Sequence, residues 1–186
     1  MLLKNTLIAS LSGLAAAAAN DTQYTNNPSF DIVALRSASK IHFSKVAAAD
    51  SSLLLGLTNQ DASCAQGTKA DGATFYMKNG ELFLYKTDSP SQQVYVDRSG
   101  MGQGRVSYVS GTNPPRNGES SGWVIDGDGN LTFDGSSLKA CLGSGDVWVI
   151  WASGDSGNPP GYDECLGFTA RTSNVKDPIS CSYTQN

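Results

Sequence analysis

Six carboxylates are the residues of this chain best suited to catalysis by type and spacing. They are Asp126, Asp128, Asp134, Asp155, Asp163 and Glu164. Two Asp or Glu side chains at a suitable separation are enough for glycoside hydrolysis, with one as the acid and the other as the base or nucleophile. Most of these residues stand in glycine-rich segments, however, where Asp is favoured because its side chain accepts hydrogen bonds from nearby backbone amides. We therefore expect turns here, and a two-carboxylate glycoside hydrolase is the second alternative function.

Aromatic side chains offer a different chemistry, because flat Trp and Tyr faces stack on sugar rings. Trp148 and Trp151 are three residues apart in a predicted strand, so they point to opposite faces. We expect one in the core and consider the other a candidate for an exposed binding face. Tyr162 follows two prolines and a glycine in a predicted loop and could join a sugar-stacking platform. The competing interpretation is that these rings fill a small core.

Other reactive groups are scarce. His42 is the one histidine of the chain, and it lies in the short alternating segment Ile41-His42-Phe43, so a structural or surface role is expected. The segment Gly100–Gly104 has the glycine spacing of a phosphate-binding loop, but it lies between two predicted strands and opens no helix. It therefore indicates a tight turn. We predict no catalytic residue, no cofactor site and no metal site.

The four cysteines are Cys64, Cys141, Cys165 and Cys181, and they contain no Cys-x-x-Cys pair. An even number of cysteines in an exported chain predicts two disulfides. Three pairings are possible. If segments 138–141, 147–151 and 166–171 form a meander, Cys141 and Cys165 lie at its opposite ends, which disfavours their direct pairing.

Alternating apolar residues separated by Gly, Asn and Asp predict an all-β fold. The expected strands are 31–37, 41–43, 53–55, 74–78, 81–85, 94–97, 106–109, 122–126, 131–133, 138–141, 147–151 and 166–171. The clearest signal is Asn79-Gly80, which predicts a hairpin with a type I′ turn. Residues 46–49 have helix propensity but are too few for a helix. A similar pattern in 75–83 and 123–133 favours a compact antiparallel barrel that is β-trefoil-like, with a β-sandwich as the alternative.

The N-terminus has the order of a secretory signal, with Lys4, an apolar stretch over 7–14 and alanines over 15–19. We predict a signal peptide over 1–19, a polar leader over 20–29 and a single all-β domain over 30–186. No hydrophobic tail for a lipid anchor is present at the C-terminus. The formal net charge of −4 argues against nucleic acid and anionic membrane surfaces as partners.

A glycosylation sequon, Asn130-Leu131-Thr132, lies on a predicted turn. Turns are where a glycan is sterically possible, so we expect Asn130 to be glycosylated. A second sequon at Asn20 lies close to the expected cleavage point.

Five segments are distinctive in combination: 31–37, 56–64, 96–104, 122–126 and 181–184. Together they resemble the PhiA-type fungal cell-wall proteins over nearly the whole mature chain, and the string Asp97–Gly104 is the most specific. Residues 123–165 are more faintly similar to the C-terminal domain of Pir-type wall mannoproteins, although the Pir glutamine-containing repeat is missing. The PhiA resemblance implies a secreted structural or interaction protein of the hyphal wall, associated with phialide development and asexual sporulation.

Its expected partners are cell-wall polysaccharide or other wall proteins, and the resemblance transfers no catalytic residue. A carbohydrate-binding module for wall glucan or chitin is the first alternative function. The oligomeric state stays open at this point.

Overall fold

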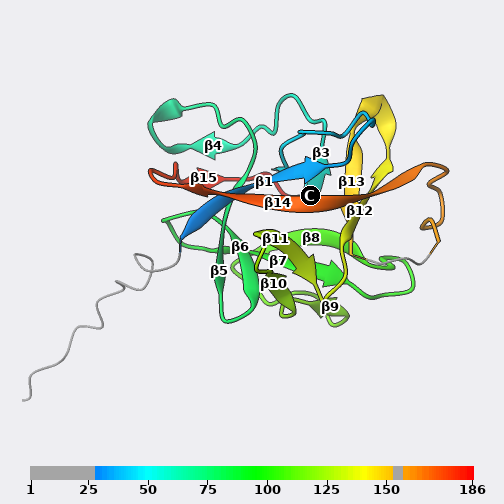
Figure 1. Cartoon of the computed structure of the whole chain (residues 1–186). Coiled ribbons are helices and arrows are strands. Elements are labelled where there is room, and N and C mark those ends of the chain that lie inside the picture. Colours follow the sequence, from blue (N-terminus) through cyan, green and yellow to red (C-terminus); the bar gives the residue numbers. More distant parts are fainter. Residues whose placement is uncertain (1–27, 153–156) are drawn as a thin grey trace, which may run out of the picture.

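The chain folds almost wholly into strands in the part that the computed structural model describes, residues 28–152 and 157–186 (Figure 1). The predicted signal peptide, residues 20–27 of the leader and Asp155 lie outside these ranges. The strands are β1 Ser29–Leu35, β2 Ala47–Ala49, β3 Ser52–Leu55, β4 Ser63–Cys64, β5 Thr74–Lys78, β6 Glu81–Leu84, β7 Gln92–Asp97, β8 Arg105–Ser110, β9 Gly118–Glu119, β10 Trp123–Ile125, β11 Asn130–Phe133, β12 Leu138–Leu142, β13 Trp148–Trp151, β14 Cys165–Val175 and β15 Cys181–Ser182. Two short 3₁₀ turns, η2 Ala65–Gly67 and η3 Ser144–Asp146, complete the elements.

Nine antiparallel strands close into a barrel, in the order β1-β5-β6-β7-β8-β3-β13-β12-β14. The ring closes where β14 runs beside β1, from Ser29 opposite Val175 to Leu35 opposite Thr169. Alternate side chains of these strands point inward and form one core, as the alternating burial of β1 and β7 shows. The predicted compact antiparallel barrel is confirmed. No helix among the described residues is long and apolar enough to cross a membrane.

The hairpin predicted at Asn79-Gly80 is confirmed. Lys78 pairs with Glu81 across the turn, and Asn79 and Gly80 have φ angles of 52° and 77°. Positive φ at both central positions is the type I′ geometry, whose twist matches that of the flanking strands. The turn therefore sets the register that places Phe75 and Leu84 opposite each other in the core.

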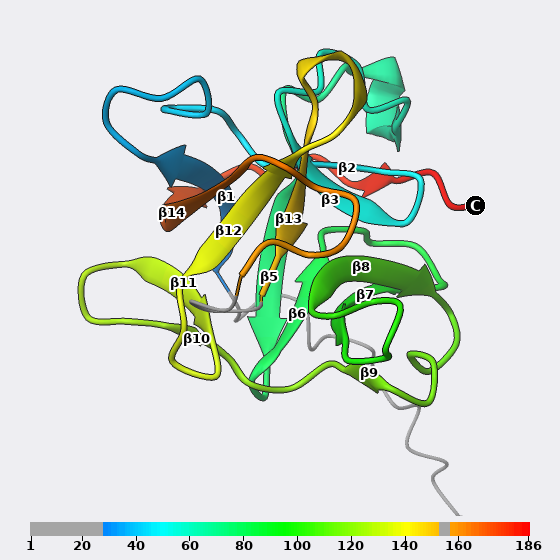
Figure 2. The same cartoon turned by 90° about the vertical axis from the view of Figure 1, so that its right-hand side faces the viewer.

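The second hairpin, β10–β11, lies outside the ring of nine strands, at the lower left of Figure 2. β11 extends the sheet from β14, and the Trp123 N–H donates to the Gly80 carbonyl at 3.1 Å. Trp123, Leu131 and Phe133 are all buried in the main core. The two hairpins that share a sequence pattern thus occupy different positions: β5–β6 is part of the barrel wall, and β10–β11 extends the sheet from β14 outside the ring.

One predicted strand, over 41–43, is wrong. Residues 41–43 form a turn rather than a strand, because Phe43 adopts a left-handed φ of 63° that ends any alternation. The alanine-rich segment, expected to be too short for a helix, contains β2, whose residues pair with β3 and are buried. So short a segment cannot satisfy its backbone as a helix, and pairing with a neighbouring strand does so.

The C-terminal residues are fastened to the barrel by a buried glutamine. The Gln92 side chain, 1% exposed, accepts from the Tyr183 N–H and donates to the Tyr183 carbonyl, both at 2.9 Å. Its amide also donates to the Ser110 hydroxyl at 3.0 Å. The Tyr108 hydroxyl donates to the Thr184 carbonyl. These bonds give the chain end a fixed place against β7 and β8, although β15 itself pairs only with β4.

Candidate functional site

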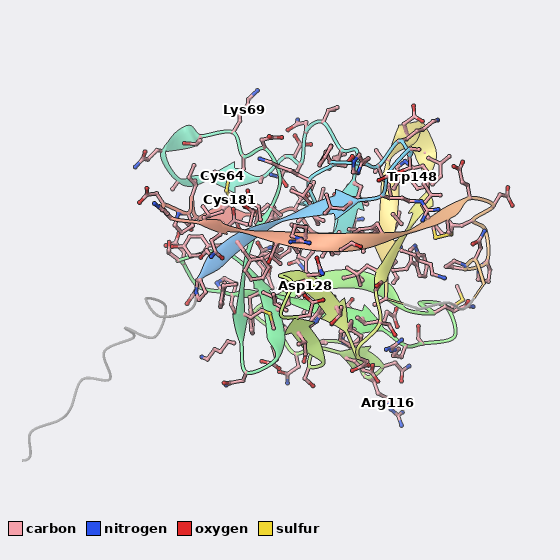
Figure 3. All side chains as sticks on the ribbon, viewed as in Figure 1. Cys64, Lys69, Arg116, Asp128, Trp148 and Cys181 are labelled. Atoms are coloured by element: carbon pink, nitrogen blue, oxygen red, sulfur yellow. A yellow bond between two sulfur atoms is a disulfide. The ribbon has the colours of Figure 1, made fainter. Side chains whose placement is uncertain are left out.

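Both predicted disulfides are present, as Cys64–Cys181 and Cys141–Cys165. Each joins two residues that lie directly opposite each other in antiparallel strands, β4 with β15 and β12 with β14. Figure 3 shows the Cys64–Cys181 bond beside the barrel where β4 and β15 pair. Both bonds fasten elements that meet only in the folded chain, so their role is structural.

The expectation that Cys141 and Cys165 do not pair directly is wrong. It assumed that the three C-terminal strands follow one another in a meander. In the barrel, β12 lies between β13 and β14 and is antiparallel to both. The long connection after β13 carries the chain back to the other edge of β12, and this brings the second cysteine opposite the first.

The two tryptophans point to opposite faces of β13, as predicted, but both are buried. Trp148, labelled in Figure 3, is 2% exposed and belongs to the main core. Trp151 is 4% exposed and packs with Cys141 and Cys165 in a second cluster. Tyr162 makes an edge-on contact with Trp151 at 5.4 Å between ring centroids and is half-buried. Burial removes the open ring face that sugar stacking requires of either tryptophan. Tyr162 stays a candidate.

The carboxylates proposed for catalysis have other partners. Asp126 Oδ1 accepts from the backbone N–H groups of Asn130 and Asp128, at 2.8 and 3.0 Å. Its pKa is lowered, chiefly by the Asn130 backbone N–H and then by the Asn130 side chain. These bonds close the turn between β10 and β11, where Figure 3 marks Asp128. A carboxylate held ionised in this way is poorly suited to be a general acid.

Two more of these candidates are exposed, and a third is paired. Asp163 and Glu164 are exposed. Asp134 receives a hydrogen bond from Arg98 Nη2 at 3.2 Å. Asp126 and Asp134 are thus engaged in structural contacts.

Arg98 gives a structural role to the string Asp97–Gly104, the most specific part of the sequence. Its guanidinium donates to Glu119 Oε2 at 2.8 Å, to Asp134 and to the Ala152 carbonyl, and it lies 5.2 Å above the Phe133 ring. One side chain thereby ties the end of β7 to β9 and to the residues that follow β11 and β13. The fork of donors on arginine suits such multiple contacts, which lysine could not reproduce.

The glycine-rich loop over 100–104 is a tight turn, as expected. The Asp97 carboxylate accepts from the Ser99 N–H at 2.8 Å, and the Gly104 N–H donates to the Asp97 carbonyl at 2.7 Å. A β-carbon on Gly102 would lie 2.0 Å from Asp97 Cγ. The glycine is therefore needed for the close approach of the loop to Asp97, and the loop has a structural task.

Sequence reasoning overlooked a Gly-x-Ser-x-Gly pattern at 118–122. In hydrolases that pattern forms a sharp turn between a strand and a helix, which exposes the serine. Here the residues between Gly118 and Gly122 connect β9 to β10, with no helix, and the Ser120 hydroxyl donates to Glu81 Oε1 at 3.2 Å. The context required for a serine nucleophile is absent from this segment.

Asn130 lies at the start of β11 and is half-buried. Its Nδ2 donates to Asp126 Oδ2 at 3.1 Å. A glycan would be attached to this nitrogen, which keeps one hydrogen for the bond to Asp126. Glycosylation of Asn130 stays a prediction, and the second sequon, Asn20, lies outside the described residues.

An exposed aromatic residue that sequence reasoning placed in a strand is Phe43, 69% exposed. The signal that could have found it is the brevity of the segment, since Ile41-His42-Phe43 is flanked on both sides by Ser and Lys. His42 stacks on this ring at 3.9 Å, and its Nδ1 accepts from the Arg36 N–H at 3.1 Å. The histidine is therefore structural, as expected.

Candidate metal ligands are not clustered in the described part of the chain, and two of its cationic side chains lie far apart. Within 28–152 and 157–186, no group of three or more His, Cys, Asp and Glu side chains is placed to hold a metal ion. Lys69 and Arg116 project from opposite ends of the molecule in Figure 3. Two cations so far apart do not act as one patch on a phosphate backbone.

Comparisons with known proteins agree over almost the full length. A family model described as PhiA-like secreted protein matches residues 30–184. The cell wall protein phiA of Aspergillus fumigatus is 44% identical over 96% of this chain and 96% of its own length. The protein of the same name from Emericella nidulans is 44% identical over 98% of this chain and 100% of its own, and that of Arthroderma benhamiae is 37% identical over 96% and 99%. No solved structure matches the chain.

Proposed function

Because the chain belongs to the PhiA-like family and is secreted to the fungal cell wall, we propose that it acts there as a structural and interaction protein in phialide development and asexual sporulation. The resemblance noted in the sequence is confirmed at the level of the family. The observation that carries the proposal is the similarity over nearly the whole chain to relatives named as cell wall proteins.

The architecture supports a role as a resident of the wall rather than as a catalyst. Two disulfides lock the β4–β15 pair beside the barrel and the β12–β14 pair within it, which suits long residence in an oxidising extracellular space. Asp126 closes a turn, and Asp134 is paired with Arg98. We propose that the chain is not an enzyme and that its partners are wall polysaccharide or other wall proteins.

Residues 1–19 are proposed to direct export and to be removed, leaving the polar leader and the barrel as the mature protein. The barrel begins at β1, which is paired on both edges, with β14 and with β5. An epitope tag is therefore best inserted between Asp21 and Pro28. The C-terminus is a poor position for a tag, since Tyr183 and Thr184 are bound to Gln92 and Tyr108.

The test is localisation and extraction of the tagged protein, combined with deletion of its gene. We expect the tagged chain in hyphal and conidiophore walls, resistant to detergent and released by glucanase or chitinase, and we expect fewer conidia in the deletion strain. A secreted reporter with the same signal sequence but no barrel is the matched control and should wash out with detergent. Detergent release of the tagged chain would contradict wall residence, and unchanged phialides and conidial counts would contradict the developmental role.

A further inference from the structure

Phe43 differs from the other large hydrophobic side chains that the described residues expose. These are Met101, Val124 and Ile179, which lack a ring. Most core aromatics of this chain are nearly inaccessible, including Trp123, Trp148 and Phe75. A single exposed hydrophobic side chain is common on a protein surface, so the case for a binding role depends on how the backbone and the neighbouring residues hold Phe43.

The backbone holds this ring outward at an energetic cost. Ile41, two residues earlier, is 1% exposed in the core, and in a regular strand Phe43 would share its face and be buried too. Instead Phe43 has a φ of 63°, which is unfavourable for a bulky residue. The Phe43 N–H donates to the Ala34 carbonyl at 2.8 Å, and the Ser44 N–H to the Ile41 carbonyl at 3.1 Å. The loop between β1 and β2, at the upper left of Figure 2, is thereby fixed in the conformation that exposes the ring.

The ring is also supported from one side. His42 stacks on it with ring centroids 3.9 Å apart and planes 33° apart. The Arg36 N–H holds His42 through Nδ1. A ring whose position is fixed before binding loses little conformational freedom on contact with a ligand.

Phe43 stands at a surface hollow of about 510 Å³ with a polar lining. The lining includes Ser44, Lys45, Thr58, Asp71 and Gly72. Lys45 Nζ lies 3.1 Å from Asp71 Oδ2, and the Asp71 side chain is 93% exposed. A pyranose ring has C–H groups on its face and hydroxyls at its edge. The Phe43 ring can contact the C–H groups, and the hydroxyl, ammonium and carboxylate groups of the hollow can hydrogen-bond to the sugar hydroxyls.

The charges of the hollow narrow the ligand class. The ammonium and the carboxylate are paired with each other, so the lining adds no net charge of either sign. The whole chain is acidic, with a formal net charge of −4, and it repels anionic polymers. A neutral sugar chain is not repelled by the acidic chain, and it does not need a net charge in the lining to bind.

We propose that the hollow beside Phe43 binds a short stretch of a neutral wall polysaccharide, a β-glucan or chitin, with one pyranose ring stacked on Phe43. This inference rests on the proposed residence in the wall, and it names the surface of the protein that would contact the wall polysaccharide. Asp71 and Lys45 accept and donate hydrogen bonds at the sugar hydroxyls, and the hydroxyls of Ser44 and Thr58 lie in the same lining.

The test is binding of the purified mature chain to insoluble β-1,3-glucan and to chitin beads, with soluble laminarin and chitin oligomers as competitors. Phe43→Asn removes the ring and tolerates the left-handed φ, so the variant should fold as stably as the original chain. We expect it to lose about tenfold in affinity, the equivalent of one stacking contact. Phe43→Trp should keep binding, and Met101→Ala, which removes an even more exposed apolar side chain elsewhere, should leave binding unchanged.

Several outcomes would overturn the inference. These are unchanged binding by Phe43→Asn, no binding of the original chain to either polymer, or a Phe43 effect on self-association in ultracentrifugation instead of on polysaccharide. Preference for glucan over chitin, or the reverse, identifies the source of the sugar ring. If Phe43→Asn still resides in the wall of the fungus, the proposed function stands and only this contact surface fails.

Discussion

At the residue scale, two buried tyrosines connect the end of the chain to the barrel. Tyr183 is 4% exposed, and its hydroxyl accepts from the Thr74 N–H at 3.3 Å. Burial is the main cause that raises its pKa, to about 12, and burial likewise raises the pKa of Tyr108. Both phenols are neutral in the folded chain at any ordinary pH, and their ionisation opposes folding.

This arrangement predicts that stability is lost at alkaline pH. Between the ordinary pKa of about 10 and the folded pKa of about 12, the unfolded chain releases the Tyr183 proton while the folded chain keeps it. The free energy of unfolding should therefore be constant up to about pH 9.5 and then fall, by about 1.4 kcal/mol for each pH unit per tyrosine.

Urea denaturation at pH 8 and pH 11 measures this. Tyr183→Phe should be less stable at pH 8 by about 1 kcal/mol, because the Thr74 N–H loses its acceptor. It should lose less stability than the original chain between the two pH values. An equal loss in both proteins would show that Tyr183 does not carry the effect.

At the scale of elements, the β7–β8 connection is determined by side chains that cap its own backbone. The Asp97 carboxylate and the Ser99 hydroxyl accept from the N–H groups of Ser99 and Gly102. Arg98 then anchors the same loop to three other segments. The loop is thus a junction of the barrel, which accounts for its unusual sequence without a ligand.

Two glycines of this loop provide a matched comparison. Gly102→Ala should destabilise the chain by about 2 to 3 kcal/mol, because the new β-carbon would overlap the Asp97 carboxylate. Gly100→Ala should change the stability little, since nothing lies within 4 Å of that position. Thermal unfolding of both variants measures the difference, and equal melting temperatures would refute the packing role of Gly102.

At the scale of the whole molecule, closure of the barrel depends on contacts between the ends of the chain. β1 pairs with β14, and the Cys64–Cys181 bond joins positions 117 residues apart. The Cys141–Cys165 bond spans 24 residues. A cross-link that closes a longer loop removes more conformational freedom from the unfolded chain.

Removal of the two disulfides should therefore have unequal effects. Replacing Cys64 and Cys181 with Ser should cost about 5 kcal/mol, and replacing Cys141 and Cys165 about 3 kcal/mol. Guanidinium denaturation of the two double variants provides the comparison. The same experiment on the reduced original chain is the control, and a larger loss for the shorter loop would contradict the loop-length explanation.

The even number of cysteines predicted two disulfides, and five distinctive segments indicated the family. Alternating apolar residues separated by Gly and Asn predicted most of the strands and the β5–β6 turn. These are local properties, since alternation and turn chemistry act between residues close together in the chain. Only the tertiary structure decided which cysteines pair, because the order β13-β12-β14 depends on strand pairing across a long connection. It also decided that Trp148 and Trp151 are both buried and that Phe43 is exposed. Exposure of a side chain depends on what other segments cover it, and a single left-handed residue at position 43 reverses what alternation predicts.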